Sequence, residues 1–303
     1  MRVFVTGASG GIGSAVLPEL LSAGHTVVGL ARSDAAASRV AALGAEPLRG
    51  DLTTLDALRA AATAADGVVH LAFSNDFTRV AEGIAEERAA VEALGSALED
   101  TDKPLVFASG TPAVPGRPST EDDPTPAEGP MAERARTAQI VLALQERGVR
   151  PAAVRLPRSV HLRGSAYGFA GMLIAAARRI GVSGYVGDGS QRWPAVNRLD
   201  AARLFRLVLE QAEPGDIAHA VADEGEMMLA IATAIGDALD LPGSPCPRRA
   251  SASSGRSSRW TSRRRARSPA SGSAGSRPIR ACSRTSQPAA TRADRRAPPE
   301  SRT

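Results

Sequence analysis

A glycine-rich turn near the start of the chain constrains the fold more than any other feature. Residues 5–13 read VTGASGGIG and lie between a β-branched and aromatic run at 2–6 and an apolar-periodic stretch. A strand, a glycine turn and a helix in this order are typical of the first unit of a dinucleotide-binding sheet. In such a unit Gly7 permits the tight turn, Gly10 lets the backbone approach a pyrophosphate, and Gly13 lets the helix pack closely. The alternative is a structural glycine-rich loop, which does not require this context.

The pattern that follows alternates between strand-like and helix-like segments up to residue 156. Buried strands are predicted at 26–31, 46–48, 67–73, 104–108 and 152–156, and helices at 35–43, 55–64, 80–98 and 132–147. This alternation predicts an α/β fold with a doubly wound parallel sheet of the Rossmann type. Beyond it the pattern is less regular. We therefore predict a Rossmann domain over 1–243, with a small, incomplete substrate lobe inserted at about 158–195 and 215–243.

The composition changes abruptly after Gly243. Residues 244–303 hold 15 Arg, no Lys and two acids, a net charge of +13, whereas the 22 basic and 30 acidic residues before them give −8. The segment has no Leu, Val, Phe or Tyr, so it cannot bury enough apolar surface to offset its chain entropy, and we predict a disordered Arg/Ser/Pro-rich tail. A nucleic-acid-binding tail is the alternative, but its arginines are scattered and it has one aromatic residue, Trp260.

The spacing Gly-x-x-Gly-x-x-Gly after a threonine resembles the extended or atypical short-chain dehydrogenase/reductase superfamily, whose members are NAD-dependent epimerase/dehydratase-like. Further segments carry the resemblance: Gly-Asp-Leu at 50–52, His-Leu-Ala at 70–72, Val-Arg-Leu-Pro at 154–157 and Trp-Pro-Ala-Val-Asn at 193–197. The resemblance covers residues 1–243. It implies a cofactor site made of Gly7, Ser9, Gly10, Gly11, Ile12, Gly13, Arg32, Asp51, Leu52, Leu71 and Ala72.

The residues after the second predicted strand indicate which dinucleotide is preferred. A fold that selects NAD places an acid there, but this chain has Arg32 followed by Ser33. A cation and a hydroxyl can receive a ribose 2′-phosphate, so we predict NADP rather than NAD. The alternative is a solvated arginine at the end of a strand.

The catalytic pair of the superfamily, Tyr-x-x-x-Lys, does not occur in this sequence, whose one lysine is Lys103. The resemblance places Met131 and Ala135 at the two positions of the pair, and neither side chain transfers a proton. It places the hydroxyl that orients the substrate oxygen at Thr111 or Ser109. A turn in which these hydroxyls only cap the strand end is an equal alternative.

The tail also admits a different origin. One back-translation of residues 260–286, shifted by one base, reads LDVPASSALTRERLGWEPPDPGLLEDL, which contains an apolar-periodic stretch. Its Leu-Gly-Trp-x-Pro segment resembles the ending of extended superfamily members. We therefore hypothesise a frameshift near 243–247.

Together these features predict an NAD(P)-dependent oxidoreductase or epimerase/dehydratase-like enzyme acting on a small hydroxyl or carbonyl substrate. The alternative is a non-catalytic NAD(P)-binding sensor or regulator, because the proton-transfer pair is missing. Both cysteines, Cys246 and Cys282, fall after Gly243, so no cysteine metal site is expected before it. Since Met1 leads directly into a strand and no apolar run is long enough to span a bilayer, we expect a cytoplasmic protein without a membrane partner. No nucleic-acid partner is expected, and the oligomeric state stays open.

Overall fold

The computed structural model describes residues 1–246 except 75, 77, 126–127 and 130–131. Its main element is a seven-stranded sheet in the order β10-β6-β5-β4-β1-β2-β3, in which every pair is parallel. The strands are β1 (Arg2–Thr6), β2 (Thr26–Ala31), β3 (Glu46–Arg49), β4 (Gly67–His70), β5 (Pro104–Gly110), β6 (Arg150–Leu156) and β10 (Ile217–His219). The predicted doubly wound Rossmann-type sheet is therefore confirmed.

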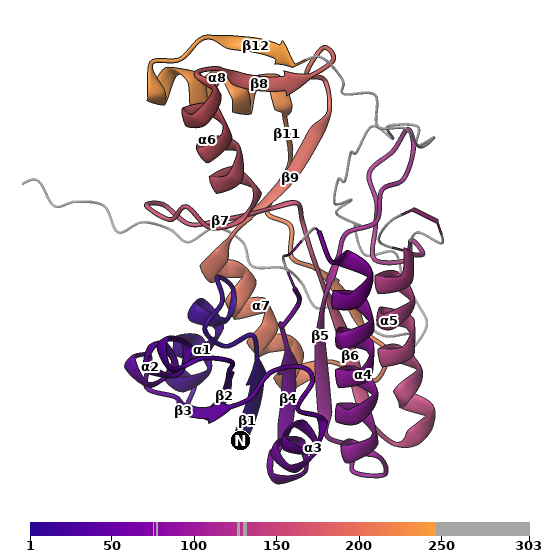
Figure 1. Cartoon of the computed structure of the whole chain (residues 1–303). Helices are drawn as coiled ribbons and strands as arrows, with labels where there is room; N and C mark the ends of the chain where they lie inside the picture. The colour runs from indigo at the N-terminus through magenta and orange to yellow at the C-terminus, as the bar shows by residue number, and fades with distance from the viewer. Residues whose placement is uncertain (75, 77, 126–127, 130–131, 247–303) are drawn as a thin grey trace, which may run out of the picture.

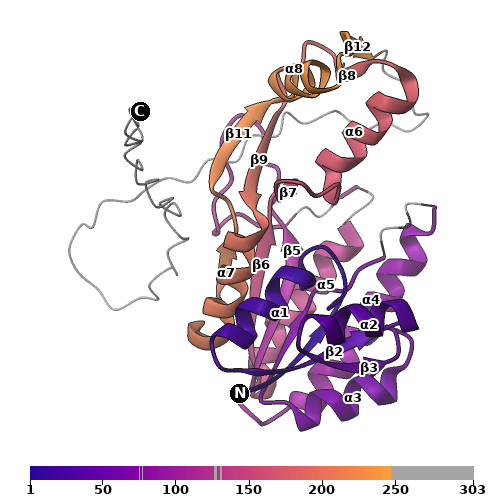
Figure 2. The same ribbon diagram turned by 90° about the vertical axis from the view of Figure 1, so that its left-hand side faces the viewer.

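Helices cover both faces of this sheet (Figures 1 and 2). One face carries α1 (Gly13–Ser22), α2 (Asp34–Ala42) and α7 (Arg198–Gln211), and the other carries α3 (Leu55–Ala64), α4 (Val80–Leu98) and α5 (Ala132–Ala143), which η1 (Leu144–Arg147) continues. Side chains alternate across β1: Val3 and Val5 pack in the core under α1 and α7, while Phe4 packs in the core under α3 and α4. The sheet is thus buried on both sides, as a parallel sheet must be.

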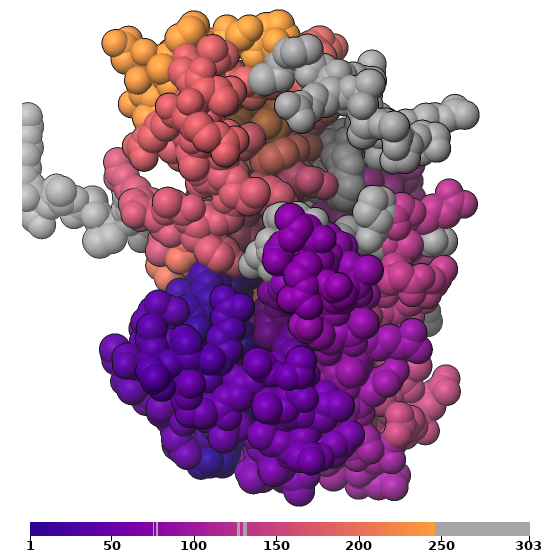
Figure 3. Space-filling model, viewed as in Figure 1, coloured from indigo at the N-terminus to yellow at the C-terminus, as the bar shows by residue number. Residues whose placement is uncertain are grey.

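A smaller lobe stands over the carboxyl ends of the strands (Figures 1 and 3). It consists of β7 (Ser159–His161), α6 (Gly168–Ile180), β8 (Ser183–Val186), β9 (Arg192–Asn197), β11 (Asp223–Met227), α8 (Met228–Leu239) and β12 (Gly243–Cys246). The strands form a three-stranded sheet β11-β9-β7 and a pair β12-β8. Because ligands of open α/β sheets bind at the carboxyl ends of the strands, the lobe lies where it can cover a bound ligand.

Two predicted boundaries of the lobe and tail are corrected. The insertion predicted at 215–243 begins with β10, which pairs with β6 in the main sheet. The tail predicted from residue 244 begins inside β12, whose residues through Cys246 pair with β8. In both places backbone hydrogen bonds to a distant strand define the element, and the composition of the sequence does not reveal such pairing. The rest of the predicted tail, 247–303, lies outside the described residues, as does Met131.

The predicted strand at 67–73 also ends early, at His70. The backbone N–H of Leu71 still donates to Thr6 O, at 3.3 Å, but it also donates to the Thr6 hydroxyl, as the N–H of Ala72 does. This departure matters for the site, because it brings the end of β4 against the glycine turn that follows β1.

Candidate dinucleotide-binding site

The turn after β1 has the geometry that its glycines predict. Gly7 has φ +66°, in the left-handed region that favours glycine, and its carbonyl accepts from Gly10 N–H at 2.9 Å. A Cβ on Gly7 would lie 2.8 Å from Ala72 N, and one on Gly13 would lie 2.3 Å from Gly7 O. Both distances are too short for a real side chain, so the turn, α1 and the end of β4 approach each other only because these positions are glycine.

The same turn presents unpaired donors. In the part of the chain that the structure describes, the backbone N–H groups of Gly11, Ile12 and Gly13 donate to no acceptor. The N-cap position of α1, Ile12, offers no side-chain cap either. Free N–H groups at a helix amino end, together with the positive end of the helix dipole, form an anion-binding site. The arrangement is suited to a phosphate group.

Thr6 ties this turn to the end of β4. Its hydroxyl accepts from Leu71 N–H and Ala72 N–H, both at 3.2 Å, and lies 3.1 Å from His70 Nδ1. Burial, with a contribution from the positive charge of Arg134, lowers the pKa of His70 to about 3. The ring is therefore neutral at physiological pH and serves to fix the segment 70–72.

Two arginines flank the carboxyl end of β2, where one was predicted. Arg32 is exposed. Arg49, at the end of β3, donates to Ala31 O at 3.4 Å and lies 3.5 Å from Asp34. The Ser33 hydroxyl caps α2 by accepting from Ala36 N–H at 3.2 Å, so its proton stays available. Sequence reasoning missed Arg49, because only the pairing of β2 with β3 brings it beside Arg32.

The predicted cofactor residues Asp51 and Leu52 lie just after β3. The Asp51 carboxylate accepts from the backbone N–H and the hydroxyl of Thr53, at 2.9 and 2.6 Å, and these bonds lower the pKa of Asp51. Leu52 packs against the core under α3. Asp51 is thus ionised and holds the turn that leads into α3.

The predicted catalytic hydroxyls lie at the end of β5, beside β4. Ser109 is the last but one residue of β5, and Thr111 follows the strand and donates its backbone N–H to Leu156 O at 3.0 Å. Both residues are buried, and neither hydroxyl has a hydrogen-bond partner among the described residues. A hydroxyl without a protein partner is free to bind a substrate oxygen.

The helix that should carry the proton-transfer pair carries a buried ion pair. Arg134 on α5 donates from Nε and Nη2 to the carboxylate of Glu87 on α4, at 3.0–3.2 Å, and from Nη2 to Ala108 O at 2.9 Å. The Glu87 side chain is fully buried, and burial raises its pKa to about 7 against the opposing effect of Arg134. Arg134 is therefore committed to packing α4 and α5 against β5.

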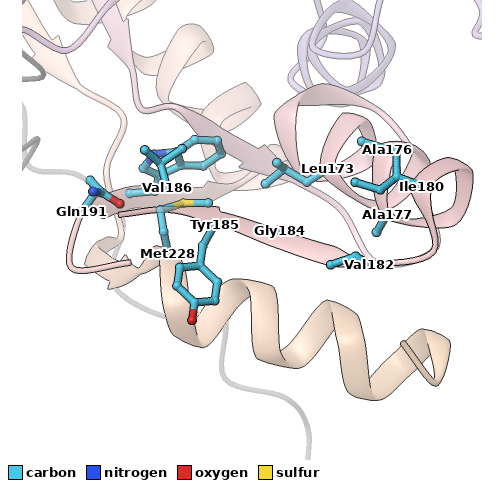
Figure 4. A pocket seen from close by; sticks show the side chains of 11 residues that line it. Leu173, Ala176, Ala177, Ile180, Val182, Gly184, Tyr185, Val186, Gln191 and Met228 are labelled. Atoms are coloured by element: carbon cyan, nitrogen blue, oxygen red, sulfur yellow. The ribbon is translucent and has the colours of Figure 1, made fainter. Parts of the chain in front are cut away.

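A separate apolar cavity lies in the lobe (Figure 4). It has a volume of about 360 Å³ and is lined by α6 residues such as Leu173 and Ile180, by β8 and by Trp193 and Met228. None of its lining residues belongs to the predicted cofactor set. The described residues include no cluster of three or more potential metal ligands, and none of their helices is long and apolar enough to cross a membrane.

Comparison with known proteins decides the family. The model of the "NAD dependent epimerase/dehydratase family" matches residues 3–221. The chain belongs to this family. An uncharacterized protein of Saccharomyces cerevisiae, YLL056C, is 43% identical over 250 residues, which cover 82% of this chain and 83% of the yeast protein. The resemblance to the extended short-chain dehydrogenase/reductases is thereby confirmed.

Two further similarities bear on the fold and on the activity of this family member. The UDP-glucose 4-epimerase of Thermus thermophilus, solved in complex with NAD, superposes with a TM-score of 0.68 at 24% identity and covers 82% of this chain and 88% of its own. At that identity the likeness shows the fold. A 4-hydroxy-2-methyl-3-oxo-4-farnesyl-3,4-dihydroquinoline-1-oxide ketoreductase of Stigmatella aurantiaca is 32% identical over 169 residues, which cover 53% of this chain and 50% of the ketoreductase.

Proposed function

We propose that this family member is an NAD(P)-dependent oxidoreductase that interconverts a hydroxyl and a carbonyl group on a small-molecule substrate in the cytoplasm. The observation that carries the proposal is the turn after β1, where three free N–H groups meet the amino end of α1. The predicted set of cofactor residues surrounds this turn along the carboxyl edge of the sheet. The ketoreductase relative supports reduction of a carbonyl as the reaction type.

We propose NADP as the preferred cofactor. Arg32 and Arg49 flank the end of β2, where a dinucleotide of this fold places its adenosine ribose. A 2′-phosphate between two guanidinium groups gains charge-assisted hydrogen bonds that a 2′-hydroxyl cannot. The carboxylate of Asp34 lies beside Arg49 but is fully exposed, so water screens its competing charge.

The substrate oxygen would be held by a hydroxyl at the end of β5. When bound, the nicotinamide supplies or accepts the hydride. Ser109 or Thr111 then donates a hydrogen bond to the oxygen on which negative charge develops. No Tyr-x-x-x-Lys pair occurs in this sequence, so the proton that the substrate oxygen gains or loses would be exchanged with water in place of the family's usual acid.

Fluorescence titration with NADPH and NADH tests the cofactor assignment. Arg32→Met and Arg49→Met should each lower the affinity for NADPH by roughly 10- to 100-fold, which corresponds to the loss of one charge-assisted hydrogen bond. The affinity for NADH should stay nearly unchanged. Arg39→Met, an exposed arginine of the neighbouring α2, is the matched control and should change neither. Equal losses for both cofactors would reject the 2′-phosphate site. No binding of either by the wild type would reject the proposed function.

The second candidate is a non-catalytic sensor of NADP(H). It is favoured by α5, where Arg134 is locked in an ion pair with Glu87 and the sequence has no proton-transfer pair. NADPH consumption with a panel of ketones and aldehydes separates the two functions. Turnover above the rate without protein supports the enzyme, whereas tight binding of NADPH without turnover on any carbonyl supports the sensor.

A further inference from the structure

A buried arginine at the amino end of α7 has no counter-ion among the described residues. Arg198, the first residue of α7, is only 6% exposed. Its Nη2 donates to the Ser165 hydroxyl at 2.6 Å, while its buried Nε has no partner. No carboxylate of the described residues lies within ion-pair distance of its guanidinium. A buried cation without an anion is costly, so the site as it stands is incomplete.

One aromatic ring contacts both this guanidinium and the glycine turn. The Tyr167 ring centroid lies 5.0 Å from Arg198 Cζ. The same ring rests on Gly11, where an added Cβ would fall 2.3 Å from its Cδ1 and Cε1 atoms. Gly11 has no side chain, and Tyr167 occupies the space that one would fill. The lobe therefore contacts the turn that binds the anion.

Three helices begin at this place. α1 starts at Gly13 beside Gly11, α6 starts at Gly168 directly after Tyr167, and α7 starts at Arg198. Neither α1 nor α6 has a side-chain cap at its amino end. Each helix dipole places partial positive charge here, and the guanidinium adds a full charge. The combined field requires a strongly charged anion.

We propose that Arg198 is a ligand of the cofactor's diphosphate, binding it from the amino end of α7 while the N–H groups of Gly11 and Ile12 bind it from the turn. Tyr167 is 37% exposed, so its ring can rotate away from Gly11 and uncover Nε without opening the core. Ser165 fixes the guanidinium in the meantime. The proposal rests on the proposed function in one respect, that a dinucleotide binds at this turn. It adds a side-chain cation at the start of α7 to the backbone donors of the turn.

Calorimetric titration of the full chain with ADP, inorganic pyrophosphate and adenosine tests this. Arg198→Met should lower the affinity for ADP and for pyrophosphate by roughly 10- to 100-fold. The affinity for adenosine should not change, because adenosine carries no phosphate. Arg198→Lys should recover part of the loss. Arg203→Met, an exposed arginine on the same helix, is the control and should bind all three as the wild type does.

Ser165→Ala and Tyr167→Ala separate a ligand from a purely structural residue. Ser165→Ala keeps the positive charge of Arg198 but no longer fixes the orientation of its guanidinium, so the affinity for ADP should fall only a few-fold. Tyr167→Ala should bind ADP at least as tightly as the wild type, because the ring only covers the guanidinium. Wild-type ADP affinity in Arg198→Met, or an equal loss for ADP and adenosine, would overturn the proposal while NADPH binding by the wild type leaves the proposed function standing.

Discussion

The burial of Glu87 makes the stability of this fold depend on pH in an unusual direction. Burial raises the pKa of Glu87 from 4.5 to about 7, and Arg134 opposes that rise. The folded protein therefore holds this proton more tightly than the unfolded chain does. Stability contributed by the neutral carboxyl is fully present below about pH 4.5 and is lost as the pH rises towards 7. A salt-bridged carboxylate with a lowered pKa would show the opposite slope.

The size of the effect follows from the same shift. A difference between 4.5 and about 7 corresponds to about 3 kcal/mol of unfolding free energy, at 1.36 kcal/mol for each pKa unit. Arg134→Met removes the opposing charge and the bidentate hydrogen bonds, so the pKa of Glu87 should rise further. At pH 8 the wild-type carboxyl is mostly ionised, whereas the variant must keep it protonated to bury it, which adds at most about 1.4 kcal/mol to the loss seen at pH 5, at 1.36 kcal/mol for the pKa unit between 7 and 8. At pH 5 the carboxyl is neutral, and the variant should lose only about 1 kcal/mol.

Urea unfolding followed by circular dichroism at pH 5 and pH 8 measures both losses. Glu87→Gln keeps the size of the side chain and cannot ionise, so its unfolding free energy should lack this pH dependence. Arg88→Met is the control, because Arg88 on the same helix makes only an exposed pair with Glu92. If Arg134→Met were equally destabilising at both pH values, Glu87 would not titrate in this range and the reasoning would be wrong.

Three further predictions address the site and the end of the chain. Gly13→Ala should abolish NADPH binding in a fluorescence titration, since its Cβ would fall 2.3 Å from Gly7 O and push α1 off the turn. Of Ser109→Ala and Thr111→Val, the one that removes the substrate-orienting hydroxyl should lower kcat by on the order of 100-fold with NADPH affinity unchanged, and the other should not. Sequencing of the coding DNA should show that the alternate frame beyond 243–247 continues with an apolar-patterned ending; a polar or interrupted alternate frame would refute the frameshift.

The parts of the fold that were predictable depend on local sequence. The glycine spacing at 7, 10 and 13 requires a turn between a strand and a helix, and the turn has the backbone geometry and contacts that this spacing implies. Helices at 55–64 and 80–98 have the predicted bounds, because an apolar periodicity along one face specifies a helix without reference to the rest of the chain. β10 was missed, since three residues carry too short a pattern.

The parts of the site that could not be predicted depend on pairs far apart in the chain. Arg49 joins Arg32 only through the pairing of β2 with β3. Tyr167 reaches Gly11 only because the lobe folds back over the sheet. Arg134 precedes Ala135, the position of the missing lysine, and only the contact with Glu87 reveals what it does. A single sequence records residue types along the chain and not which polar groups meet across it.

In this fold, anion binding would depend on backbone groups and proton transfer on side chains, so one can change without the other. The proposed anion site uses backbone N–H groups of the turn and the dipole of α1, which few side-chain substitutions can remove. Proton transfer in the family depends on two side chains of the helix after β5, and here that helix holds Arg134 against Glu87 and Ala108 O. A chain can therefore lose the Tyr-x-x-x-Lys pair and keep the glycine turn with its free N–H groups. For this reason NADPH affinity and carbonyl turnover are independent measurements, and a positive result in the first does not imply one in the second.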